Sequence, residues 1–76
     1  MTTLGQLRVG DSAKVIGFAG TDNAYRRKLL AMGLTPGAQI DITRVAPMGD
    51  PVEIRVRGFS LSLRKEEAAA INVEKL

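Results

Sequence analysis

Three basic residues stand together at Arg26, Arg27 and Lys28, and they are the densest basic group in this 76-residue sequence. Guanidinium and ammonium groups of this kind bind carboxylates and phosphates. Histidine and cysteine are absent, which removes the commonest general base, the thiolate nucleophile and the usual nitrogen and sulfur ligands of iron and zinc. We therefore expect no catalytic residue, no metal site and no cofactor, and we expect a surface that binds a partner.

The carboxylates and glycines do not suggest an enzyme either. The eight Asp and Glu residues are scattered along the chain, and the adjacent pair Glu66 and Glu67 lies in a charged turn signal, which predicts a solvated pair. No Gly-Lys-Ser or Gly-Lys-Thr follows any glycine at the spacing of a phosphate-binding loop. We therefore expect the protein neither to bind nor to hydrolyse nucleotides.

A second basic group is predicted on the outer face of the strands: Arg44, Arg55, Arg57 and Arg64. Arginines on strands can contact phosphates, so nucleic-acid binding is an alternative function. A single-strand binder also needs exposed aromatic side chains on which bases stack, and the chain has only one Tyr, two Phe and no Trp. The net charge is +3 with the basic residues dispersed, so the overall field favours nucleic acid only weakly.

A helix is predicted over Ala24–Met32, a segment without proline or β-branched residues. The residues before it, Thr21, Asp22 and Asn23, are candidate N-caps. Gly33 and Leu34 predict a Schellman-type end in which Leu34 contacts the helix. Pro36-Gly37 suits the two central positions of a type II turn.

Alternating apolar residues predict strands, and a charged Ala-rich segment predicts a helical turn. The strands are Ser12–Phe18, Gln39–Val45, Val52–Arg57, Phe59–Leu63 and Ile71–Val73, and the helical turn is Lys65–Ala70. Gly58 predicts a tight turn or bulge between two of them. The order is that of a single mainly β domain spanning residues 1–76: a small five-stranded SH3-like barrel, with a short α-helix after the first strand and a helical turn before the last.

The core that follows from the alternation is Val15, Leu29, Ile40, Ile42, Val52, Ile54, Val56, Leu61, Leu63, Ile71 and Val73. Phe59 shares the apolar alternation of Leu61 and Leu63 and is predicted to point inward with them.

Three motifs in this order, YRRKLLAMGLTPG, TRVAPMGDP and RGFSLSLRKEEAAAI, make the sequence resemble the FeoA family. These are small cytosolic proteins that accompany the membrane GTPase of bacterial ferrous-iron uptake. The resemblance runs from about Phe18 to Val73, with Met48 where leucine is more usual in the APLGDP form. It implies an SH3-like barrel that binds the FeoB-type transporter on its cytoplasmic side and supports ferrous-iron uptake.

The predicted contact surface is the outer face of the helix together with the Ala46–Pro51 loop. Its residues are Tyr25, Arg26, Arg27, Leu30, Met48 and Asp50. Charge would assist the encounter, and Leu30 or Met48 would supply an apolar anchor. The alternative is a regulator of the partner's GTP hydrolysis, in which Arg26 or Arg27 acts in trans.

The location expected from the sequence is the cytoplasm, at the inner face of the membrane only through the partner. The sequence shows neither a secretory signal pattern at its start nor an apolar run that could span a bilayer.

Overall fold

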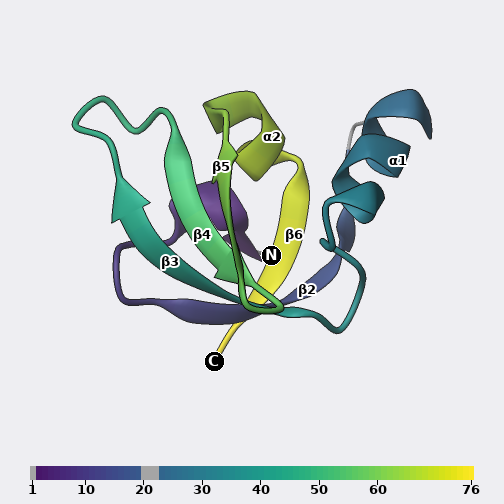
Figure 1. Ribbon diagram of the computed structural model, residues 1–76, viewed down its shortest axis with the longest axis horizontal. Helices are drawn as coiled ribbons and strands as arrows, with labels where there is room; N and C mark the ends of the chain where they lie inside the picture. The colour runs from purple at the N-terminus through teal and green to yellow at the C-terminus, as the bar shows by residue number, and fades with distance from the viewer. Residues whose placement is uncertain (1, 20–22) are drawn as a thin grey trace.

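Six antiparallel strands form one curved sheet, in the order β1-β6-β2-β3-β4-β5 (Figure 1). The computed structural model describes residues 2–19 and 23–76. In chain order the elements are β1 (Thr2–Thr3), a 3-10 helix η1 (Leu4–Gln6), β2 (Ser12–Phe18), α1 (Asn23–Ala31), β3 (Gln39–Val45), β4 (Val52–Val56), β5 (Phe59–Leu63), α2 (Lys65–Ala69) and β6 (Ile71–Lys75).

The sheet confirms the predicted SH3-like barrel, with α1 after β2 and α2 directly before β6. All five predicted strands are present, and the two-residue strand β1 adds a sixth by pairing with β6. The last strand runs on to Lys75 rather than ending at Val73, because its far end pairs with the start of β2. Two residues are too few for a periodic pattern, so alternation could not reveal β1.

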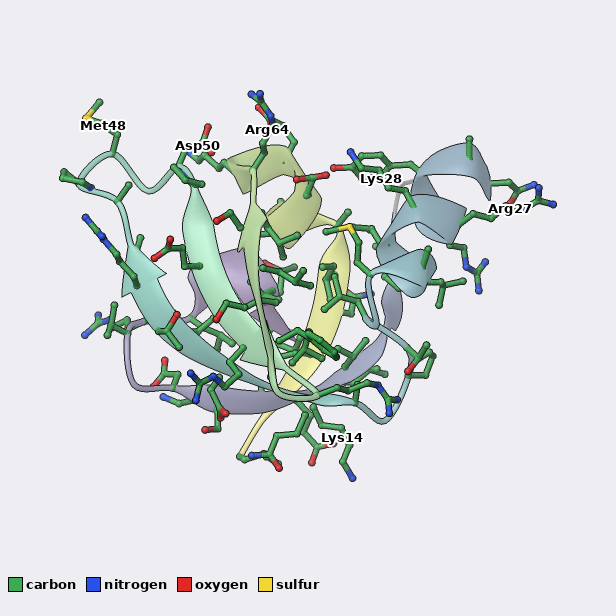
Figure 2. The ribbon with its side chains drawn as sticks, in the orientation of Figure 1. Lys14, Arg27, Lys28, Met48, Asp50 and Arg64 are labelled. Atoms are coloured by element: carbon green, nitrogen blue, oxygen red, sulfur yellow. The ribbon has the colours of Figure 1, made fainter. Side chains whose placement is uncertain are left out.

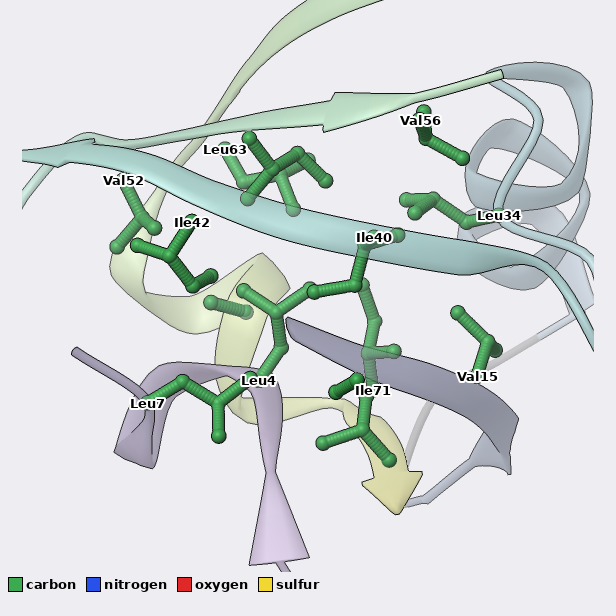
Figure 3. Packing of buried hydrophobic residues seen from close by; sticks show 14 of the residues in the cluster. Leu4, Leu7, Val15, Leu34, Ile40, Ile42, Val52, Val56, Leu63 and Ile71 are labelled. Carbon is green, nitrogen blue, oxygen red and sulfur yellow. The ribbon is translucent and has the colours of Figure 1, made fainter. Parts of the chain in front are cut away.

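The core fills the inside of the curved sheet, with side chains from both ends of the chain packed together (Figure 3). Every predicted core residue is buried except Leu61, which is half-buried. Leu4, Leu7 and Leu34 join the core although they lie outside the predicted strands and helix. Leu4 and Leu7 belong to or follow the 3-10 helix η1, so neither a period of two nor one of 3.6 marks them as buried.

Helix α1 ends as its sequence predicts. The N–H of Gly33 donates to the carbonyl of Leu30 at 3.0 Å, and the N–H of Leu34 donates to the carbonyl of Leu29 at 3.2 Å. These two bonds define a Schellman end, with Gly33 at φ +94° and with Leu29 and Leu34 fully buried. Of the candidate N-caps, Thr21 and Asp22 lie outside the described residues, and Asn23 is the first residue of the helix.

The predicted type II turn follows at once. Gly37 has φ +91°, and the N–H of Ala38 donates to the carbonyl of Thr35 at 3.0 Å across the turn. The N–H of Gly37 also donates to the carbonyl of Val15 at 2.7 Å, which ties the turn to β2. The helix end and the turn together fix the direction in which the chain enters β3.

Gly33→Ala is expected to lower the free energy of unfolding by about 1–2 kcal/mol, because an L-residue is strained at the positive φ of this position. A Cβ there would lie 3.8 Å from Arg57 Cδ, so the cost comes from the backbone and not from a clash. Gly17→Ala is the matched control, since Gly17 has no positive φ and nothing within 4 Å, and it should cost less than about 0.5 kcal/mol. Urea denaturation of both variants provides the comparison, and equal midpoints would contradict the expectation.

The β4–β5 hairpin closes through Arg57 and Gly58, at φ 52° and 81°, with Val56 paired to Phe59. Positive φ at both central residues marks a type I′ turn, so the predicted turn at Gly58 is confirmed and β4 ends at Val56, one residue earlier than predicted. Phe59, which is not among the predicted core residues, is 71% exposed. It lies beside the turn on a strand at the edge of the sheet, where the core no longer covers the inner face.

Candidate partner-binding surface

The basic face of α1 is open to solvent. Arg26 and Arg27 are exposed, and Figure 2 shows Arg27 pointing away from the sheet. The guanidinium carbon of Arg26 lies 6.0 Å from the centroid of the Phe18 ring, a cation–π distance that holds this arginine against the end of β2. Among the described residues, Arg27 has no carboxylate within ion-pair distance.

The other two predicted residues of the helix, Tyr25 and Leu30, are half-buried. Tyr25 packs against the core and forms a hydrogen bond with Glu67. Burial, followed by the negative charge of Glu67 and then of Glu66, raises the pKa of the Tyr25 hydroxyl. Tyr25 therefore belongs to the side of α1 that faces the barrel, and only its exposed part can contribute to a contact surface.

Glu67 is the important residue that the sequence analysis misread. The prediction of a solvated Glu66–Glu67 pair is correct for Glu66, which is exposed, and wrong for Glu67, which is 7% exposed. The backbone N–H of Arg64 donates to Glu67 Oε1 at 2.8 Å, and Lys28 Nζ lies 3.3 Å from Glu67 Oε2.

Glu67 therefore closes the first turn of α2 and reaches across to α1. It lies at the third position of α2, where an acidic side chain folds back onto the N-cap residue. The N-cap position of this arrangement usually holds Ser or Thr, and here it holds Arg64. The sequence therefore lacks the pattern that would have predicted the role of Glu67. The N–H of Arg64, and after it Lys28, lower the pKa of the Glu67 carboxyl against an opposing effect of burial.

The Ala46–Pro51 loop presents Met48 and Asp50. Met48 is 86% exposed at the tip of the loop. The N–H of Gly49 donates to the carbonyl of Ala46 at 2.8 Å, which forms a tight bend in the loop. Asp50 is exposed, and its Oδ1 accepts a hydrogen bond from the N–H of Lys65 at 3.2 Å, so this loop is tied to the start of α2.

The six predicted residues fall on two separate surfaces. Figure 2 shows Met48 and Arg27 at opposite ends of the longest axis of the molecule. The structure thus brings Arg26, Arg27 and Leu30 together on α1, with Met48 and Asp50 apart from them on the loop between β3 and β4. The sequence could not show this separation, because it depends on which sides of the sheet the two connections cross.

Across residues 2–19 and 23–76, no three carboxylates converge as they would around a metal ion. Within the same ranges, none of the helices has the length and apolar character needed to cross a membrane.

Known proteins of similar sequence include a curated fusion protein from Porphyromonas gingivalis (strain ATCC BAA-308 / W83), named Fe(2+) transport protein A/Fe(2+) transporter FeoB fusion protein. It is 38% identical over 71 residues, which are 93% of this chain but only 8% of the fusion protein.

Two solved structures are similar over nearly the whole chain. The NMR structure of a FeoA-like protein from Clostridium acetobutylicum is 46% identical with a TM-score of 0.87, covering 100% of this chain and 91% of that one. The crystal structure of a zinc complex of FeoA from Stenotrophomonas maltophilia, described as a prokaryotic SH3 domain protein, is 26% identical with a TM-score of 0.84, covering 97% and 91%. The family description FeoA domain matches residues 2–75, and this chain therefore belongs to the FeoA domain family.

Proposed function

We propose that the protein is a non-enzymatic adaptor or regulator that binds the cytosolic side of a FeoB-type membrane GTPase and supports ferrous-iron uptake. One observation carries the proposal: in the Porphyromonas gingivalis relative, a segment 38% identical to this chain is joined to FeoB in one polypeptide. Covalent linkage maintains a high effective concentration of one module beside the other, an arrangement useful for two proteins that bind each other. On this proposal the protein is cytoplasmic and reaches the inner face of the membrane through its partner.

The proposed contact surface is the outer face of α1, with Arg26 and Arg27 as the charged residues and the exposed part of Leu30 as the apolar contact. Tyr25 supports this face from its inner side through Glu67. Met48 and Asp50 form a second candidate contact at the other end of the molecule (Figure 2). A partner that touches both must reach around the barrel, so we place the main contact on α1.

Removing the two exposed charges of α1 tests this surface. The double variant Arg26→Ala/Arg27→Ala is expected to weaken binding to the cytosolic region of the FeoB-type protein. At about 0.2–1 kcal/mol for each exposed charge pair, the loss is about 2- to 30-fold. Isothermal titration calorimetry at low and moderate salt provides the measurement, and the difference between the proteins should shrink as salt rises.

The matched control is Lys14→Ala/Arg44→Ala, which removes the same charge from two exposed strand residues. Lys14 lies at the bottom of the view in Figure 2, away from α1. If both double variants lose the same affinity, only the net charge matters and the assignment to α1 is wrong. If wild type itself does not bind, the adaptor proposal fails.

A second candidate function is acceleration of the partner's GTP hydrolysis. The exposed guanidinium of Arg27, which pairs with no carboxylate among the described residues, favours it, because an arginine supplied in trans can stabilise the charge of a phosphoryl-transfer transition state. The Stenotrophomonas protein has itself been suggested to be an activating factor of ferrous-iron transport. GTP turnover with and without this protein separates the two functions: binding without a change in turnover supports an adaptor alone, whereas a rise that Arg27→Ala abolishes supports activation.

A further inference from the structure

Strand β5 has one edge that no other described strand pairs with. It stands last in the strand order, and β4 is its only partner among the described strands. The pair that closes the two-residue turn, Val56 and Phe59, exchanges hydrogen bonds, and so do alternate pairs beyond it. The backbone N–H and C=O groups of Ser60 and Ser62 therefore point away from β4, and both serines are exposed.

An apolar groove lies beside this edge. It has a volume of about 400 Å³ and runs between the C-terminal end of α1 and the β4–β5 hairpin. Met32 on the helix side and Phe59 and Leu61 on the strand side provide its large apolar side chains. Among the apolar side chains of β5, Phe59 is 71% exposed, Leu61 is half-buried and Leu63 is fully buried, so the groove beside Phe59 and Leu61 opens to solvent at the hairpin end.

Arginines stand at both ends of the free strand. Arg57 precedes it and Arg64 follows it, and neither has a carboxylate within ion-pair distance in the described part of the chain. Arg57 lines the groove and donates from Nη2 to Thr35 Oγ1 at 2.8 Å. It also holds φ 52°, a turn position that suits Asn or Gly much better than a long side chain. Backbone strain is often retained at functional positions, so we take Arg57 as a candidate binding residue.

We propose that β5 is a docking edge for an extended segment of the partner, which adds as a further strand along Ser60 and Ser62. The segment carries an apolar side chain that enters the groove against Met32, Phe59 and Leu61, and carboxylates that meet Arg57 and Arg64 at its ends. Strand addition at a free edge derives affinity from backbone hydrogen bonds and specificity from the pockets beside it. The inference rests on the proposed function, since it names the FeoB-type protein as the source of this acidic, apolar segment.

Amide exchange in the complex tests the edge directly. The probe is the recombinant cytosolic region of the FeoB-type protein encoded in the same genome. The amides of Ser60 and Ser62 should exchange at least about tenfold more slowly in the complex than in the free protein, because each gains a backbone acceptor. The amide of Val9, in the turn before β2 and outside every proposed contact surface, is the internal control and should not change. A complex that leaves Ser60 and Ser62 unprotected would overturn this inference alone, whereas failure to form any complex would overturn the proposed function and this inference with it.

Three variants separate the contribution of the backbone hydrogen bonds from that of the charge. Ser62→Pro removes an N–H that points away from β4, so the hairpin ladder stays intact at this edge position, and binding should weaken about tenfold or more. Ser62→Thr keeps the N–H and should bind within about twofold of wild type.

Arg57→Asn suits the type I′ turn and removes the cation, so it should fold at least as well as wild type and bind about three- to tenfold more weakly. If Ser62→Pro proves unfolded, Arg57→Asn and the exchange measurement still test whether the partner binds along β5. The inference is overturned if the variants fold and bind the partner with the affinity of wild type.

Discussion

Replacing Ile54 with alanine is expected to lower the free energy of unfolding by about 2–5 kcal/mol. Ile54 is fully buried at the centre of β4, where it pairs with Ile42 on one side and Leu61 on the other. Both neighbouring strands hold it in place, so the cavity left by the missing atoms has little room to collapse. A domain of this size has a free energy of unfolding of about 5–10 kcal/mol at best, so this one change removes a large share of it.

Urea denaturation followed by far-ultraviolet circular dichroism provides the measurement. The matched variant is Leu61→Ala, on the neighbouring strand and paired directly with Ile54. Leu61 is only half-buried and borders the groove beside α1, so its truncation should cost about 1–2 kcal/mol. The core assignment is wrong if the two variants have the same midpoint, or if Ile54→Ala unfolds at the urea concentration of wild type.

The contrast between Ile54 and Leu61 shows what the alternation of apolar residues can predict. It identifies the face of a strand that points toward the core, but not how deeply each residue on that face is buried. A period of two identified the inner face of β3, β4 and β5, because each of these strands has one side on the core. It placed Phe59, Leu61 and Leu63 on one face of β5 and predicted that Leu61 is as buried as Leu63, although Leu61 is only half-buried. Coverage of a strand end depends on what packs across it, and a pattern within one strand does not contain that information.

The turns were more predictable than the site. Gly33, Leu34 and Pro36-Gly37 act through local backbone geometry, so their residue types sufficed. The contact surface depends on the path of the whole chain, which places Met48 and Arg27 at opposite ends of the molecule (Figure 2). Their roles in binding remain predictions.

Glu67→Ala is the second change with a large expected effect, at about 1.5–3 kcal/mol, the usual cost of losing a hydrogen bond to a charged group. The variant loses the acceptor for the N–H of Arg64 and the contact with Lys28. The Lys28 side chain is 62% exposed, so the ion pair itself adds little. The neighbouring variant Glu66→Ala, at an exposed position, should cost less than about 0.5 kcal/mol.

The loss of Glu67 should also extend beyond α2. Because Glu67 contacts Lys28 and Tyr25 of α1, the amides of α1 should exchange faster in Glu67→Ala than in Glu66→Ala. A local role in α2 alone would leave α1 exchange unchanged. Loosening of α1 also alters the groove beside β5, since Met32 and Gly33 form its helix side.

Glu67 also makes the free energy of unfolding depend on pH, so that the protein becomes less stable as the pH falls. Its pKa in the folded protein is lowered from the ordinary value of 4.5, first by the N–H of Arg64. A carboxyl with a depressed pKa in the folded state stabilises fully above its unfolded pKa and loses that contribution as pH falls through the folded pKa. The melting temperature of wild type should therefore fall more steeply below pH 4.5 than that of Glu67→Gln, whose amide oxygen can still accept from Arg64 but does not titrate. Parallel curves for the two proteins below pH 4.5 would show that Glu67 acts through its shape and hydrogen bonds rather than through its charge.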